Sequence, residues 1–116
     1  MQEADLEEVF LRLAIQRSQD LERNVSAANK AYGELHRLKN RMRLLPDKGE
    51  AMLKRISAYP NVEVQIVACA ALLAVDEPFA VAALESIEQT SSGLASITAS
   101  MTIREWQAGN LAEYWA

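Results

Sequence analysis

Hydrophobic residues recur every three or four positions through most of the chain, which is the spacing of one face of an α-helix. The pattern predicts six helices, at residues 3–23, 25–45, 48–57, 62–75, 77–89 and 94–108. The first helix carries an apolar face of Leu6, Val9, Phe10 and Leu13. The second carries a nearly unbroken stripe of Ala28, Ala31, Tyr32, Leu35, Leu38, Met42 and Leu45. We expect these two helices to pack on each other, although the second stripe also suits a short coiled-coil seam.

Capping and breaking residues set the boundaries between these helices. Pro46 ends the second helix, and Asp47 with Glu50 resembles a capping box that opens the third helix at residue 48. Asn61 follows a proline and is expected to cap the fourth helix, and Asp76 is expected to cap the fifth. Short turns therefore join the predicted helices, with no linker between them.

The last three helices differ in how their apolar residues are distributed. Beyond Gln65 the fourth helix is apolar on every side, which is typical of a helix buried between neighbours. The fifth is expected to turn inward Phe79, Ala82, Ala83, Leu84 and Ile87. The sixth is expected to turn inward the stripe Leu94, Ile97, Met101 and Ala108, which leaves Ile103 and Trp106 on the opposite side.

Composition supports a single all-α domain. The chain has 116 residues, of which 50% are hydrophobic and 24% charged, enough apolar material for one core. Four glycines, three prolines and 6% aromatic residues are few for a sandwich or barrel. We divide the domain, residues 1–116, into a long helix pair at 1–45, a second pair at 47–75, a third at 77–108 and a tail at 109–116.

Residues suited to catalysis are scarce. One histidine and one cysteine exclude a Cys/His zinc site within one chain, so we expect no metal and no cofactor. His36 lies off the apolar stripe and is expected at the surface, whereas Cys69 lies in the apolar helix and is expected in the core. Paired acids such as Asp76 and Glu77 fall at helix starts, where the helix dipole favours them. We therefore expect no enzymatic activity.

The ends and hydropathy of the chain indicate a cytoplasmic protein. The first residues are acidic, where a secretory signal is basic and then apolar. The longest uncharged apolar stretch, residues 64–75, is well short of the roughly 20 residues that span a bilayer.

Charge is distributed unevenly around the net value of −4. The basic residues of positions 36–55 are Arg37, Lys39, Arg41, Arg43, Lys48, Lys54 and Arg55, against Asp47 and Glu50. The acidic residues of positions 56–116 are Glu63, Asp76, Glu77, Glu85, Glu88, Glu105 and Glu113, against Arg104 alone. The basic run lacks interleaved aromatics and is expected to be a solvated surface, which makes nucleic-acid binding unlikely. The acidic half is better suited to capture a basic partner.

Aromatic residues gather near the same end. Ile103, Trp106, Tyr114 and Trp115 need cover, either because the tail folds back over the sixth helix or because they anchor a partner. The expected partner-binding residues are Asp76, Glu77, Glu85, Glu88, Glu105, Trp106, Glu113, Tyr114 and Trp115.

The middle of the chain resembles a HEAT-type helical repeat. The resemblance rests on Leu53, Ile56, Tyr59, Pro60, Asn61, Val64, Ala68, Ala70, Leu72 and Leu73. Small residues in the second helix let stacked helices approach closely. Gln65 stands where many such repeats have arginine. More broadly, residues 3–108 resemble a small bacterial family of HEAT-like proteins that is catalogued only as a domain of unknown function.

The resemblance implies a HEAT-like stack of about six helices, and some HEAT-like proteins of this size are immunity proteins against bacterial toxins. We therefore expect a protein-binding module, with an immunity protein that neutralises a toxin as its most specific form. An adaptor or self-associating scaffold, monomeric or dimeric through the second helix, is the first alternative. A weak nucleic-acid binder that uses Arg37 to Arg43 is the second.

Overall fold

Six α-helices make up the fold of residues 3–21 and 23–110, which are the residues described by the structure, a computed structural model. The helices are α1 (Glu3–Asp20), α2 (Val25–Arg43), α3 (Pro46–Ser57), α4 (Val62–Leu72), α5 (Glu77–Thr90) and α6 (Leu94–Gln107). No strand occurs in this part of the chain. The all-α prediction with six helices is confirmed, and the predicted helix ends differ from the observed ones by at most three residues.

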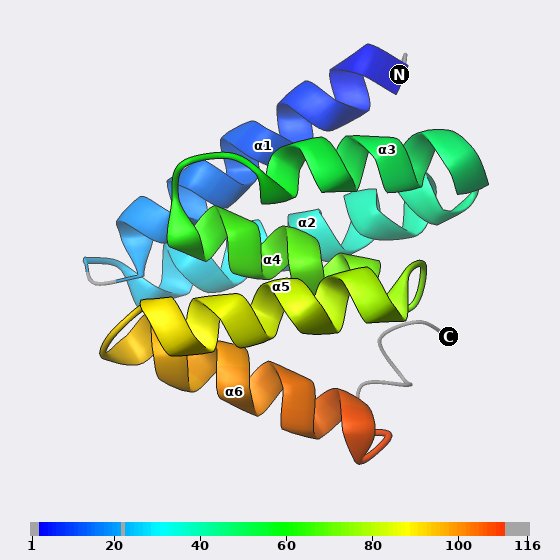
Figure 1. Cartoon of the computed structure of the whole chain (residues 1–116). Helices are drawn as coiled ribbons and strands as arrows, with labels where there is room; N and C mark the ends of the chain where they lie inside the picture. Colours follow the sequence, from blue (N-terminus) through cyan, green and yellow to red (C-terminus); the bar gives the residue numbers. More distant parts are fainter. Residues whose placement is uncertain (1–2, 22, 111–116) are drawn as a thin grey trace.

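The helices pack as three sequential pairs around a central helix. α1 packs on α2, α3 on α4, and α5 on α6 (Figure 1). α4 also contacts α1, α5 and α6, so it is surrounded by four neighbours. Among the described residues no helix is both long enough and apolar enough to cross a membrane.

The composition of α4 explains its central place. Val64, Ala68 and Leu72 are fully buried, and Cys69 is buried beside them, as the apolar sequence predicts. A helix without a polar face is stable in water only where neighbours cover it on several sides. Burial in this apolar setting raises the pKa of the Cys69 thiol to about 11.

Side-chain caps begin α4 and α5 as predicted. The Asn61 side chain accepts hydrogen bonds from the backbone N–H groups of Glu63 (3.0 Å) and Val64 (3.3 Å). Asp76 accepts one from the N–H of Phe79 at 3.3 Å. These side-chain oxygens bind backbone N–H groups of the first helical turn that have no hydrogen-bond partner within the helix.

The start of α3 differs from the prediction. The helix begins at Pro46, and Leu45 holds the cap position without a side-chain hydrogen bond, so the expected cap at Asp47 is wrong. Proline suits the first position of a helix, because its fixed φ is helical and its missing N–H is not needed there. The corner between α2 and α3 is tight, since a Cβ added to Gly49 would lie 2.2 Å from the Met42 carbonyl oxygen.

The inward faces of α5 and α6 also differ from the prediction. In α5 the inward positions of Leu84 and Ile87 are confirmed. Ala80 is also buried, whereas Ala82 is exposed and not inward as predicted. Phe79 is 39% exposed and lies under the Lys54 ammonium, 4.8 Å from its ring centroid. In α6 the buried residues are Ala95, Ala99 and Ile103, whereas the stripe expected to face inward is exposed. The helix is therefore turned so that its small residues meet the rest of the molecule.

Candidate functional site

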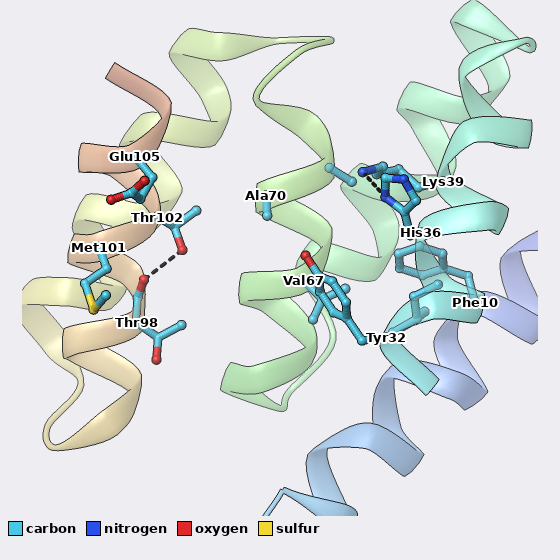
Figure 2. A pocket seen from close by; sticks show the side chains of 12 residues that line it. Phe10, Tyr32, His36, Lys39, Val67, Ala70, Thr98, Met101, Thr102 and Glu105 are labelled. Atoms are coloured by element: carbon cyan, nitrogen blue, oxygen red, sulfur yellow. Dashed lines mark hydrogen bonds between the residues drawn. The ribbon is translucent and has the colours of Figure 1, made fainter. Parts of the chain in front are cut away.

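A groove lies between α2 and α6, with α4 as its floor (Figure 2). Its volume is about 340 Å³. The groove, called here the α2–α6 groove, is lined by Phe10 of α1, Tyr32, Leu35, His36 and Lys39 of α2, Val67, Ala70 and Ala71 of α4, and Thr98, Met101, Thr102 and Glu105 of α6. It is thus assembled from segments far apart in the sequence.

The floor of the groove follows from the small residues of α4. Ala70 and Ala71 project little beyond the helix backbone, and Val67 is only half-buried. Larger side chains at these positions would fill the space between the two walls. The same small residues that allow close helix packing therefore also leave a hollow over α4, between α2 and α6.

The α2 wall contains a charged side chain that is almost fully buried. Lys39 is 7% exposed, and its Nζ lies 2.9 Å from Nδ1 of His36, one turn earlier in the same helix. Burial, and secondarily the nearby Lys39 charge, lower the pKa of His36 below its ordinary value. The imidazole is therefore neutral at pH 7 and accepts the hydrogen bond, so the pair carries one positive charge.

The α6 wall is more polar and more exposed. Figure 2 shows Thr98, Met101, Thr102 and Glu105 on α6, on the other side of α4 from the α2 residues. The Thr102 hydroxyl donates to the Thr98 carbonyl at 2.7 Å. Glu105 is exposed and accepts a hydrogen bond from the Asn110 side chain at 2.8 Å. The groove therefore has a buried cation on one wall and a solvated carboxylate on the other.

An exposed apolar stripe continues the α6 wall. Leu94, Ile97 and Met101 are 65%, 56% and 55% exposed and lie three and four positions apart, on one face of the helix. We call these three residues the α6 stripe. Met101 belongs both to the stripe and to the groove, so the two features form one continuous surface.

The predicted partner-binding residues differ in how exposed they are and in what they contact. Glu77, Glu85, Glu88 and Glu105 are exposed on α5 and α6. Asp76 is bound to Lys54 at 2.8 Å, in addition to its cap. Trp106 is partly buried against the core on the inward side of α6. Glu113, Tyr114 and Trp115 lie outside the described residues.

Two residues of the α2 wall were not expected there. His36 was predicted at the surface but is half-buried in the groove, and Lys39 was predicted on a solvated face but is buried. The helical spacing carries a signal for Lys39, because this residue follows Leu35 by four positions and precedes Met42 by three, in line with the apolar stripe. The charge of Lys39 favours exposure, whereas its position in the helix favours burial, and the structure buries it.

Several other charged side chains form ion pairs, most of them between neighbouring helices. Arg55 of α3 binds Glu7 of α1, with Nε 3.0 Å from Oε1, and this contact raises the pKa of Arg55. Lys54 binds Asp76 and, at 3.1 Å, Glu50. These contacts, together with the burial of Lys39, reduce the basic surface expected for residues 36–55. Residues 3–21 and 23–110 contain no cluster of three histidine, cysteine or acidic residues that would hold a metal ion.

Comparisons with known proteins identify the fold and a family. Residues 4–106 match the family described as "Domain of unknown function (DUF2019)". A similar solved structure is the crystal structure of the protein RPA1889 from Rhodopseudomonas palustris CGA009, with 23% sequence identity and a TM-score of 0.85 over 94% of this chain and 91% of that chain. No curated protein matches the sequence. At this identity the structural likeness establishes the fold alone.

Proposed function

Because the chain belongs to the DUF2019 family, which is defined without a function, we propose its role from its own surface: a non-enzymatic protein-binding module. The α6 stripe is the observation that carries this proposal. Three large apolar side chains on one helical face, continuous with a groove, form the kind of surface that binds proteins. The lone cysteine supports a role without catalysis, since its raised pKa of about 11 leaves it protonated and unreactive at neutral pH.

The exposed charge of α5 and α6 favours a basic partner. The exposed acids of α5 and α6 are Glu77, Glu85, Glu88 and Glu105, and Arg104 is the one basic residue in the sequences of these two helices. An acidic surface speeds the capture of a basic protein and disfavours acidic ones. The stripe would then supply the apolar contact that holds the partner after it has been captured.

The most specific form of the proposal is an immunity protein that binds and neutralises a bacterial toxin. A cationic toxin, such as one that acts on nucleic acid, fits the acidic surface of α5 and α6. An adaptor or self-associating scaffold uses the same apolar stripe and is the alternative. Binding of nucleic acid through α2 is less favoured, because Lys39 is buried within the set Arg37, Lys39, Arg41 and Arg43.

Affinity purification from the native host, with a matched pair of variants, tests the proposal. The stripe variant carries Leu94→Gln, Ile97→Gln and Met101→Gln, and the control carries Val25→Gln and Leu44→Gln at apolar residues that are also exposed. We expect a basic protein to be captured by the native chain and the control and to be lost with the stripe variant. Capture that is insensitive to the stripe variant contradicts the proposed site.

Two further measurements distinguish the forms of the proposal. Co-expression with the captured protein should restore growth if that protein is a toxin, and the stripe variant should not restore it. Sedimentation of the purified chain tests the scaffold alternative. A dimer that is abolished by the stripe variant favours self-association over a foreign partner.

A further inference from the structure

The floor of the α2–α6 groove is apolar and only partly covered by the described residues. Val67 and Ala70 of α4 are half-buried there, and Met101 of the α6 wall is 55% exposed. The volume of about 340 Å³ is large enough for one aromatic side chain. Because apolar surface gains free energy when it is removed from water, this floor favours an apolar occupant.

The C-terminal end of α6 brings the chain to the rim of the groove. Gly109 has a φ of +81°, in the left-handed region, and its N–H donates to the Trp106 carbonyl at 3.0 Å. The Asn110 N–H donates to the Glu105 carbonyl at 2.9 Å, which completes the pair of hydrogen bonds that ends many helices. The Asn110 side chain also binds the Glu105 carboxylate, at 2.8 Å. Since Glu105 lines the groove, the residue that follows Asn110 starts beside it.

The sequence that follows Asn110 is apolar enough, and long enough, to fill the groove. Residues 111–116, which lie outside the described residues, read Leu-Ala-Glu-Tyr-Trp-Ala. Three of these six residues carry a large apolar side chain, namely Leu111, Tyr114 and Trp115. Six residues span up to about 20 Å, whereas the axes of neighbouring helices lie about 8–10 Å apart. The segment can therefore reach across the α4 floor from the α6 rim.

We infer that residues 111–116 dock in the α2–α6 groove of their own chain, with the ring of Tyr114 or Trp115 over Val67 and Ala70. Proximity favours this occupant over a second copy or a foreign peptide. The Asn110 contacts hold the start of the segment at the rim, and so short a link gives an effective concentration in the millimolar range. The inference goes beyond partner binding, because it assigns the two aromatic residues to the inside of the molecule, whereas the sequence alone also allows them to anchor a partner.

Nuclear Overhauser effects in the full chain test the inference directly. We expect cross-peaks between the ring protons of Tyr114 or Trp115 and the methyl groups of Val67 and Ala70. Their intensity relative to other cross-peaks should not change on dilution, since the contact lies within one chain. Cross-peaks from the rings to the α6 stripe alone, or none to α4, overturn the inference. Cross-peaks that are lost on dilution indicate a second copy and overturn it as well.

A matched pair of variants tests the docking from the side of the segment. Tyr114→Ser with Trp115→Ser removes both rings and should shift the amide signals of the groove floor. Leu94→Ser with Ile97→Ser removes two exposed apolar side chains that do not line the groove, and should leave those signals unchanged. Floor signals that are the same in the first variant as in the native chain contradict the inference.

A second pair tests the docking from the side of the floor. Ala70→Leu fills the space over α4 and should abolish the cross-peaks from the rings to Val67, whereas Ala82→Leu, at an exposed site of α5, should keep them. Cross-peaks that persist unchanged in Ala70→Leu contradict the inference. If Ala70→Leu does not fold, the cross-peaks of the native chain and the serine variants still decide.

Discussion

The helices α4 and α6 are both rich in apolar residues, yet α4 buries most of them, whereas α6 exposes several of its largest. In α4 every direction around the helix is apolar, and neighbours cover it on several sides. In α6 two apolar stripes compete, and the structure buries Ala95, Ala99 and Ile103 while it exposes the larger residues of the α6 stripe. The size of an apolar side chain therefore does not by itself decide which face of a helix is buried.

Close packing between helices explains which face of α6 is buried. Alanine lets two helix axes approach to the short end of the usual 8–10 Å range, and Ala80 of α5 and Ala99 of α6 are both fully buried. A short distance between axes increases dispersion contacts along the whole helix pair. Leu94, Ile97 and Met101 would hold the helices further apart, and they lie on the exposed face of α6 instead.

The largest expected effect comes from the same substitution in the two helices. Leu72→Ala in α4 removes a fully buried side chain and should lower the free energy of unfolding by about 2–5 kcal/mol. Leu94→Ala in α6 removes an exposed one and should change it by less than about 0.5 kcal/mol. Urea unfolding followed by circular dichroism measures both. Equal losses in the two variants would show that the α6 stripe is packed in solution.

The thiol of Cys69 reports the burial of α4 directly. With a pKa of about 11 in the folded chain, against about 8.5 for an ordinary thiol, Cys69 should react with iodoacetamide at pH 8.5 roughly 100-fold more slowly than in the urea-unfolded chain. The unfolded state also loses this proton first, so the free energy of unfolding should fall as the pH rises from about 8.5 to 11. Equal alkylation rates in the two states contradict the burial of Cys69.

The close packing of α6 is tested by adding volume. Ala99→Leu places a larger side chain at a fully buried position and should destabilise the fold by about 1–3 kcal/mol. Ala82→Leu makes the same change at an exposed position of α5 and is the control. Thermal unfolding of both variants is the measurement. A stabilising Ala99→Leu would indicate that α6 is rotated toward the orientation predicted from the sequence.

The sequence predicts α4 and its surroundings well because independent local signals agree there. The Asn61 cap, the Asp76 cap and the apolar composition all point to a central helix, and each is observed. The helical spacing does carry a signal for the burial of Lys39, whereas the orientation of α6 depends on distances between helices, which that spacing does not encode. The groove was missed for the same reason, since it forms where residues of α2, α4 and α6 meet only in the folded chain.

The smallest predicted effect concerns the contact that ties the start of α5 to α3. The hydrogen bond from Lys54, foremost, and the cap bond from Phe79 lower the pKa of Asp76, so its carboxylate stabilises the fold above the ordinary aspartate pKa of about 3.9. This stabilisation is lost as the pH falls through the lower pKa of the folded state.

Asp76→Asn keeps a capping oxygen but removes the charge. The urea midpoint of this variant should lie slightly below that of the native chain at pH 7 and match it at pH 2. The control, Glu88→Gln at an exposed acid of α5, should have the midpoint of the native chain at both pH values. A difference that persists at pH 2 would mean that the shape of the Asp76 cap, and not its charge, holds the α5–α6 pair in place.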